Sequence, residues 1–394
     1  MPTESTFVLA ALFVVAAAMG WAFARWSGQR DKESKAVPIS ADYLRGLNLV
    51  LNRQTDEALE LFISMAKVDD DTLETHFALG HLFRRRGEVD RAIRVHQNLL
   101  ARPNLNETQR HQALFSLAED YLGAGLFERS EKLFSELVDS PTIATAALEN
   151  LINIYERESE WMQAIDAHRK LEVLNGEKSS RGGHYYCELA ELARAQGDFE
   201  LARQYLKNSV RSGSGALRGG LIKAAIAQEE GNYAEALRLY EQVIEMDRRF
   251  MVEVLGSLVE CHKQLGSEHE LELYLEGLLK RETSLEQDIA YAAVVGNLTE
   301  PTIVSRCIEN FIVNNDLLAS FVNVNGLAAQ DALHREQEIA RIAGALRRLA
   351  VSSARYLCTN CGYSSKGFIW HCPSCKSWET VRPLQTFQFD GLIS

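Results

Sequence analysis

Four of the seven cysteines form two tight pairs near the carboxyl end of this 394-residue chain. Two residues separate Cys358 from Cys361, two separate Cys372 from Cys375, and ten lie between the pairs. Each C-x2-C turn directs two thiolates at one ion, so two such turns complete a tetrahedron. Four thiolates leave no open position for a substrate, which favours a structural role over a catalytic one. The spacing therefore predicts one metal ion per chain, zinc, held by these four residues.

The segment that carries these cysteines, residues 355–383, is expected to fold as a small metal-binding domain, which we call the knuckle. Gly362 directly follows the first pair and Pro373 lies within the second, and both residues suit tight turns. Zinc contributes about 10–16 kcal/mol to sites of this kind, and a segment this short does not hold a core without it. His371 adjoins Cys372, but a complete set of four thiolates leaves it outside the ligand set.

The two cysteine turns, CxxCG and CPxC, resemble those of rubredoxin, an iron-containing electron carrier. The spacer between the turns is much shorter here than in rubredoxins. The short spacer argues against electron transfer, although iron stays possible in place of zinc. A membrane-anchored, rubredoxin-like electron carrier is kept as the alternative function.

The amino-terminal region predicts a membrane anchor. Residues 7–24 contain no charge, and a helix of that length covers roughly 27 Å, close to the ~30 Å hydrocarbon core. Four basic residues follow it, namely Arg25, Arg30, Lys32 and Lys35. By the positive-inside rule, the flank at 1–6 is then expected to be periplasmic and the bulk of the protein cytoplasmic. We expect a single transmembrane helix at 7–25 in the inner membrane and a linker at 26–40.

A cleaved signal peptide is the rival interpretation, because Ala16–Ala18 could serve as a cleavage site. Signal peptides begin with basic residues, whereas residues 1–6 contain Glu4 and no Lys or Arg. A periplasmic protein of that kind would have a shortened amino terminus and oxidised cysteines. The odd number of cysteines is a poor disulfide framework, and metal-binding thiols indicate a reducing compartment.

Between residues 41 and 353 apolar residues recur at helical spacing, with an internal period. The steps between matching positions are 34, 38, 34, 38, 34 and 35 residues, the positions being 58, 92, 130, 164, 202, 236 and 271. The period resembles that of the tetratricopeptide repeat, a pair of antiparallel helices. We therefore expect an all-α superhelix whose concave face binds peptide segments.

Residue types within the repeats agree with this interpretation. Small residues such as Gly80 and Ala92 let paired helices approach closely. Glycines at the turns suit the left-handed conformation that ends a helix; the turn glycines are Gly87, Gly125, Gly197 and Gly231. Phe62, Phe134 and Tyr240 are expected to pack against the next unit. Beyond Arg281 the period fades, and two or three degenerate helical pairs are expected, including a long helix around 329–350.

The charge distribution suggests how the knuckle is held. The knuckle carries four basic residues against Glu379, namely Arg355, Lys366, Lys376 and Arg382, whereas the whole chain has a net charge of −12. An acidic chain is a poor general binder of nucleic acid, which needs clustered Lys and Arg. Zinc ribbons can bind nucleic acid, but we expect this one to dock on the last repeats of its own chain through its aromatic residues, Tyr356, Tyr363, Phe368, Trp370 and Trp378.

No catalytic constellation stands out in the sequence. Four histidines fall on repeat helices, where packing or exposure explains them; they are His76, His81, His96 and His111. There is no Ser-His-Asp set, paired-carboxylate cleft or phosphate-binding glycine loop. A non-enzymatic scaffold is therefore expected.

The order of anchor, tetratricopeptide array and rubredoxin-like module resembles the lipopolysaccharide assembly protein B (LapB) family of Gram-negative bacteria. The resemblance is carried by FRRRGEVDRAIRVHQNLL at 83–100, HYYCELA at 184–190 and the cysteine turns within 356–378. It implies an inner-membrane regulator of lipopolysaccharide biosynthesis that acts as an adaptor. Its implied partners are the membrane AAA+ protease FtsH, the deacetylase LpxC that it presents for degradation, and other lipopolysaccharide assembly proteins of the inner membrane.

Three matters stay open at this point. The sequence does not identify the groove residues that bind a substrate, the regulatory signal, or the oligomeric state, a homo-oligomer included. A generic repeat scaffold for envelope assembly complexes is the third reading of the function. Residues 384–394 are expected to form a tail.

Overall fold

The computed structural model describes residues 41–52, 73–213, 215–282, 284–315 and 332–384, with 19, 21, 54, 57, 58, 61 and 318. The transmembrane helix predicted at 7–25, the linker at 26–40 and the tail at 384–394 lie outside the described residues, apart from Met19, Trp21 and Leu384. Among the helices within the described ranges, none is both long enough and apolar enough to span a bilayer. The chain divides into two compact units, residues 1–144 and 145–394.

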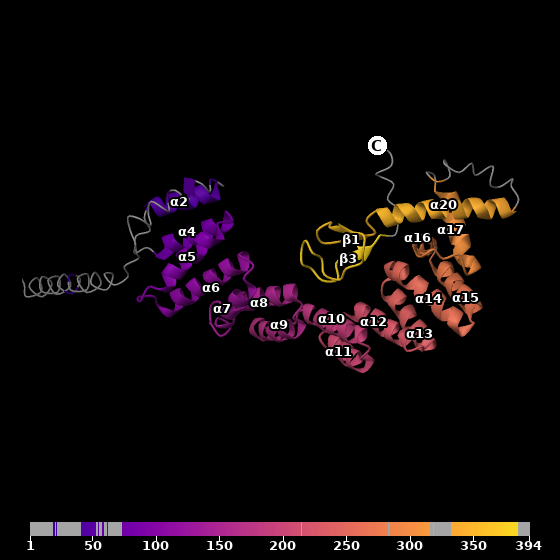
Figure 1. The fold of residues 1–394 in the computed structure, drawn as a ribbon, viewed down its shortest axis with the longest axis horizontal. Helices are drawn as coiled ribbons and strands as arrows, with labels where there is room; N and C mark the ends of the chain where they lie inside the picture. The colour runs from indigo at the N-terminus through magenta and orange to yellow at the C-terminus, as the bar shows by residue number, and fades with distance from the viewer. Residues whose placement is uncertain are drawn as a thin grey trace, which may run out of the picture. The chain divides into compact units, whose positions relative to one another are not determined.

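The described part of the first unit is helical (Figure 1). Those described are α2 (Ala41–Leu51), α4 (Leu73–Arg85), α5 (Val89–Leu100), α6 (Glu107–Gly123) and α7 (Phe127–Ser135). α4 packs against α5, and α6 against α7. α6 begins where it does because Asn106 and Gln109 form a capping box, in which each side chain accepts a hydrogen bond from the other residue's backbone N–H.

The second unit continues the pairs and adds the knuckle. Its helices are α8 (Ala144–Glu158), α9 (Trp161–Asn175), α10 (Arg181–Ala195), α11 (Phe199–Arg211), α12 (Ala216–Glu229), α13 (Tyr233–Met246), the 3₁₀ turn η1 (Arg248–Phe250), α14 (Met251–Leu265), α15 (Glu268–Arg281), α16 (Leu285–Gly296), α17 (Thr302–Asn314) and α20 (Ala332–Ser352). The strands are β1 (Tyr356–Cys358), β2 (Ser364–Ser365) and β3 (Val381–Pro383).

The repeat period predicted from the sequence is confirmed by burial. All seven matching positions are at most 1% exposed, namely Ala58, Ala92, Ser130, Ala164, Ala202, Ala236 and Leu271. Ser130 is the polar exception among them, and its hydroxyl donates a hydrogen bond to the carbonyl of Ala118 over 2.8 Å, which satisfies it inside the helix pair. Phe134 and Tyr240 are buried as predicted, whereas Phe62 lies outside the described residues.

The predicted turns are also confirmed. The four glycines at the turns between paired helices have φ between 74° and 79°, and are Gly87, Gly125, Gly197 and Gly231. The turn between α8 and α9 has no glycine, and Ser159 takes the left-handed conformation there, with φ of 59°.

Gly80 in α4 shows how tightly the first unit is packed. A Cβ atom on Gly80 would lie 2.4 Å from Cε1 and Nε2 of His96, a fully buried side chain of α5. We expect Gly80→Ala to destabilise α4 and α5 by about 1–3 kcal/mol, because the imidazole has to move. Amide hydrogen exchange in the two helices would measure the change.

Gly123, at the end of α6, provides the matched control. Its nearest neighbours would be 4.0 Å from an added Cβ, so Gly123→Ala is expected to leave the protection of α4 and α5 unchanged. Equal protection of the Gly80→Ala protein and the parent would contradict this account of the helix pair.

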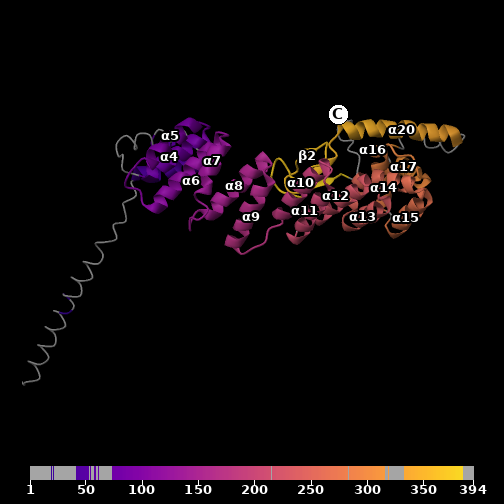
Figure 2. The same ribbon diagram turned by 60° about the horizontal axis from the view of Figure 1, so that its bottom comes forward.

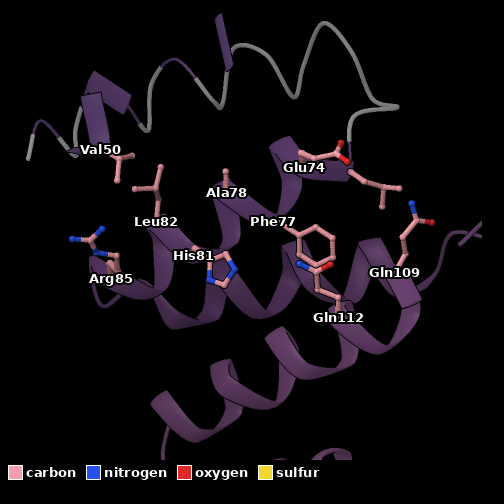
Figure 3. Close-up of a pocket in the computed structure, with 10 residues that line it drawn as sticks. Val50, Glu74, Phe77, Ala78, His81, Leu82, Arg85, Gln109 and Gln112 are labelled. Atoms are coloured by element: carbon pink, nitrogen blue, oxygen red, sulfur yellow. The ribbon is translucent and has the colours of Figure 1, made fainter. Parts of the chain in front are cut away.

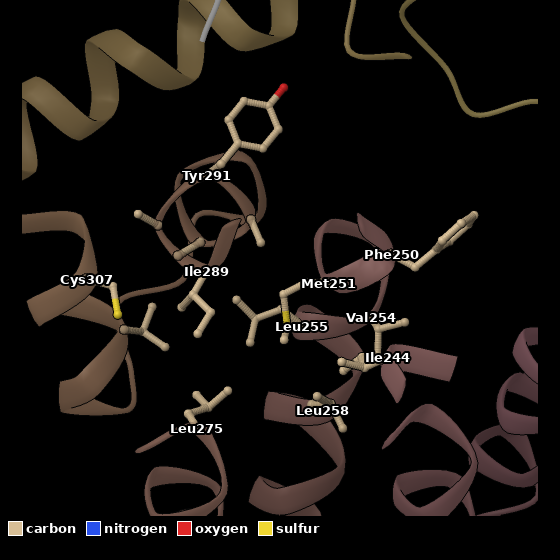
Figure 4. Packing of buried hydrophobic residues seen from close by; sticks show 14 of the residues in the cluster. Ile244, Phe250, Met251, Val254, Leu255, Leu258, Leu275, Ile289, Tyr291 and Cys307 are labelled. Atoms are coloured by element: carbon tan, nitrogen blue, oxygen red, sulfur yellow. The ribbon is translucent and has the colours of Figure 1, made fainter. Parts of the chain in front are cut away.

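The second unit has a continuous core formed by α12 to α17 and α20 (Figure 4). Residues with no exposed surface include Met251, Leu255 and Leu258 of α14 and Cys307 of α17. Beyond Arg281, where two or three helical pairs were expected, the described residues contain one pair, α16 and α17, and the expected long helix, α20. α20 packs on both α16 and α17.

Candidate metal centre and its docking surface

The four paired cysteines come together. The sulfurs of Cys358, Cys361, Cys372 and Cys375 all lie within 4.8 Å of one another. Two cross pairs, Cys358 with Cys375 and Cys361 with Cys372, have sulfurs 3.7 Å apart. A tetrahedral zinc site with bonds of about 2.3 Å requires about 3.8 Å between sulfurs. The side-chain geometry therefore fits one metal ion.

A three-stranded sheet positions the first cysteine turn. The strand order is β2-β1-β3 with antiparallel pairing, and Leu357 of β1 is paired with Ser364 on one side and Arg382 on the other. In each cysteine turn, the residue after the second cysteine donates its N–H to the carbonyl of the first cysteine over 2.9 Å. These residues are Gly362 and Lys376, with φ of 75° and 57°. The two turns thus have the same backbone form.

Polar neighbours favour thiolates in this site. Hydrogen bonds from the side chains of Ser377 and Asn360 lower the pKa of Cys375 to about 5. Burial raises the pKa of Cys372 to about 11. A metal ligand has to be a thiolate, and a cation at the centre of the cluster would stabilise the thiolate form of the buried Cys372.

Trp378 makes the main contact between the knuckle and the repeats. Its ring stacks on those of His184 and His371, with centroids 5.2 and 4.4 Å away and interplanar angles of 10° and 7°. Its Nε1 donates a hydrogen bond to Oε1 of Glu156 over 3.0 Å, and the same oxygen accepts one from the Tyr185 hydroxyl over 2.7 Å. Burial lowers the pKa of His184 to about 4, so the stacked ring is neutral.

Phe250 of η1, whose side chain is labelled in Figure 4, makes a second contact with the knuckle. Trp370 stacks on it at 5.7 Å with an interplanar angle of 10°, and Phe368 meets it edge-on at 5.4 Å. The guanidinium of Arg218 lies 5.5 Å from the centroid of Trp370 and is paired with Glu188 at 2.9 Å. These rings thus form a second aromatic contact between the knuckle and the rest of the second unit.

A hydrogen bond and an ion pair complete the docking surface. The Tyr356 hydroxyl donates to Oε1 of Glu253 over 2.6 Å, and Nε of Arg382 lies 3.5 Å from Oδ2 of Asp247. Of the four basic residues of the knuckle, Arg382 therefore pairs with an acidic group of the repeats, in agreement with the expected docking on its own chain. In Figure 2 the knuckle is drawn beside α10 and α12.

Three family models match parts of the chain. The model described as rubredoxin metal binding domain matches residues 356–383. Two models described as tetratricopeptide repeat match residues 75–110 and 187–249.

Curated relatives cover nearly the whole chain. Lipopolysaccharide assembly protein B of Escherichia coli strain K12 is 34% identical over 389 residues, which is 97% of this chain and 98% of that protein. The chain belongs to the lipopolysaccharide assembly protein B family. The Haemophilus influenzae protein of the same name is 30% identical over 385 residues, 95% of this chain and 97% of that one.

Two of the matching solved structures resemble only part of the chain. MamA from Desulfovibrio magneticus has a TM-score of 0.33 and 16% identity, covering 43% of this chain and 92% of its own. PilF from Pseudomonas aeruginosa has a TM-score of 0.31 and 18% identity, covering 53% and 91%. Both likenesses are too low to bear on function.

The docking prediction for this LapB family member is confirmed in part. The knuckle contacts the last in-phase repeats through α12, η1 and α14, but it also reaches the earlier helices α8 and α10. This further reach follows from α20, whose 21 residues extend for roughly 30 Å and carry the chain back along the second unit. Tyr363 was wrongly assigned to the contact, since it is 37% exposed.

Several residues of this surface could not be found from the sequence. Glu156, His184 and Asp247 are far from the knuckle along the chain and follow no local motif. The left-handed conformation of Lys376 could have been predicted, because Lys376 follows the second cysteine turn as Gly362 follows the first. His371, expected outside the ligand set, stacks on Trp378 and is close to the carbonyl oxygen of Lys376, 3.0 Å from its Nε2.

Trp378→Ala is expected to release the knuckle from the repeats. The ring is 9% exposed, and removing a buried tryptophan typically costs about 3–5 kcal/mol. Hydrogen exchange in α10 and protease cleavage within 355–383 should both rise. Tyr363→Ala, an aromatic truncation on the exposed side, should leave both unchanged; equal effects of the two substitutions would contradict the assigned contact.

Proposed function

We propose that this protein is an inner-membrane adaptor that regulates lipopolysaccharide biosynthesis by presenting the deacetylase LpxC to the membrane protease FtsH. The observation that carries the proposal is 34% identity over 97% of the chain to a protein named for lipopolysaccharide assembly. The named protease and deacetylase come from the family resemblance set out above.

The architecture supports an adaptor rather than a catalyst. Stacked helical pairs provide an extended surface for protein segments, and the repeat models match this chain at 75–110 and 187–249. In this proposal the segment at 7–25 anchors the chain, and the repeats and the knuckle face the cytoplasm, where LpxC is bound.

Removing the protein from cells tests this function. Depletion is expected to raise the steady-state level of LpxC severalfold, because the protease loses its adaptor, and plasmid-borne full-length chain should restore it. An unchanged LpxC half-life after depletion would contradict the proposal.

We further propose that the four knuckle cysteines hold zinc, as one structural ion per chain. Cys358, Cys361, Cys372 and Cys375 offer four soft sulfur ligands within 4.8 Å of one another, a set that zinc and iron both accept. Iron is the alternative, since the matching model is described as a rubredoxin domain.

Metal analysis of aerobically purified protein separates these two ions. We expect one zinc per chain and no visible absorbance bands. One iron per chain with visible charge-transfer absorbance would contradict the zinc assignment and favour the electron-carrier reading.

A further inference from the structure

A pocket of about 390 Å³ opens between α2, α4 and α6 in the first unit (Figure 3). Six of its lining residues lie on one face of α4 in two rows with a spacing of three or four residues; one row is Glu74, Phe77, His81 and Arg85, and the other is Ala78 and Leu82. Val50 of α2 and Gln109 and Gln112 of α6 line it from the neighbouring helices. The walls are apolar in the middle and charged or polar at the edges.

His81 places a hydrogen-bond donor in this pocket. Its Nδ1 is 2.7 Å from Nη2 of Arg84, and because a guanidinium only donates, Nδ1 is the acceptor and the proton is on Nε2. Burial, together with the nearby charge of Arg84, lowers the pKa of His81 to about 4, so the ring is neutral. No described residue accepts a hydrogen bond from Nε2.

A buried network fixes the position of Arg84 and therefore of the His81 ring. The guanidinium is paired with Glu119 at 2.7 Å and with Asp120 at 2.6 Å. Asp120 is fully buried and is also hydrogen-bonded to Nδ1 of His96 over 2.5 Å. The orientation of the donor is thus set by three helices, α4, α5 and α6.

Opposite charges mark the two ends of the pocket. Glu74 and Arg85 are exposed, and neither forms an ion pair with a described residue. Eleven residues along a helix correspond to about 16 Å, the length of about five residues of extended chain. The amides of Gln109 and Gln112 offer both donors and acceptors, as an extended backbone requires.

We infer that this pocket binds an extended segment of about five residues from a partner protein. One apolar side chain of leucine size enters between Phe77 and Leu82, and a backbone carbonyl accepts the hydrogen bond from His81. A basic residue of the segment lies toward Glu74 and an acidic residue toward Arg85. The inference rests on the proposed adaptor function and specifies the chemistry of the segment that the adaptor recognises.

A designed peptide tests the apolar part. The probe is a fluorescein-labelled Lys-Ala-Leu-Ala-Glu flanked by glycines, titrated with the zinc-loaded full-length chain in detergent and followed by anisotropy. Replacing its leucine by serine, or filling the pocket with Ala78→Trp, should weaken binding at least about tenfold. The control charge swap Glu128→Lys with Lys132→Glu, on α7 away from the pocket, should have no effect.

A charge exchange tests the direction of the segment. The double variant Glu74→Lys with Arg85→Glu should prefer the peptide in which lysine and glutamate are exchanged. His81→Asn keeps an acceptor for Arg84 but lacks the donor at the Nε2 position, so binding should weaken about threefold to tenfold, and His81→Gln should recover part of it. Circular dichroism confirms that each variant is folded.

Three results would overturn the inference: no binding of the probe below about 1 mM, equal binding of the leucine and serine peptides, or the same charge preference before and after the exchange. These outcomes are separate from the proposed function. If the protein controls LpxC in cells but does not discriminate between the peptides, only the inference is overturned. If it discriminates between the peptides but does not control LpxC, only the proposed function is overturned.

Discussion

Replacing Cys358 and Cys361 by serine is expected to abolish metal binding and unfold the knuckle. The knuckle has only three short strands, and metal contributes about 10–16 kcal/mol to such sites, far more than its small core supplies. Metal analysis of the purified double variant should find less than one tenth of the parent's zinc. Cys307→Ala, at a buried thiol of α17 outside the cluster, should keep the full stoichiometry.

Loss of the metal should also expose the surfaces of the repeats that contact the knuckle. Trp378 and Trp370 are held against His184 and Phe250 by the folded knuckle, so these surfaces of α10 and η1 become exposed in the double variant. Hydrogen exchange should rise there, and control of LpxC should be impaired in cells. Unchanged zinc content in the double variant would defeat the assignment of these ligands.

Deleting residues 1–26 is expected to give a folded protein that no longer controls LpxC. A tether raises the effective concentration of an adaptor beside a membrane protease, often by a factor of 10²–10⁴, and the truncated chain loses that gain. The measurement is the LpxC level in cells that carry only the truncated form, with circular dichroism to confirm folding.

A substituted anchor provides the control for this deletion. An unrelated transmembrane helix fused at residue 27 should restore regulation if tethering alone is needed. Full regulation by the untethered form would refute the requirement for a membrane anchor.

The sequence was sufficient for the repeats and for the cysteine cluster because both depend on local spacing. Ala92 and Ala202 are buried because a 34-residue period places them between paired helices, and two C-x2-C turns bring four sulfurs together whatever lies around them. The resemblance to LapB rests on the same short segments, and identity along the whole chain confirms it.

The docking surface could not be predicted, because it joins residues with no local relation to one another. Glu156 and Trp378 are 222 positions apart and meet only through the return path that α20 provides. The row of residues that lines the pocket on α4 could have been predicted from the sequence, since Phe77, His81 and Arg85 are four residues apart and therefore lie on one face of a helix. Assigning His81 to packing or to the surface missed the hydrogen bond with Arg84 that fixes its tautomer.

Reconstituted proteolysis tests the adaptor role most directly. Purified FtsH in lipid nanodiscs is mixed with LpxC and ATP, with and without the full-length zinc-loaded chain in the same membrane, and the LpxC half-life is followed on gels. We predict a markedly shorter half-life with the chain present, and no shortening with the Cys358→Ser and Cys361→Ser protein. The same half-life with and without the chain would contradict the account.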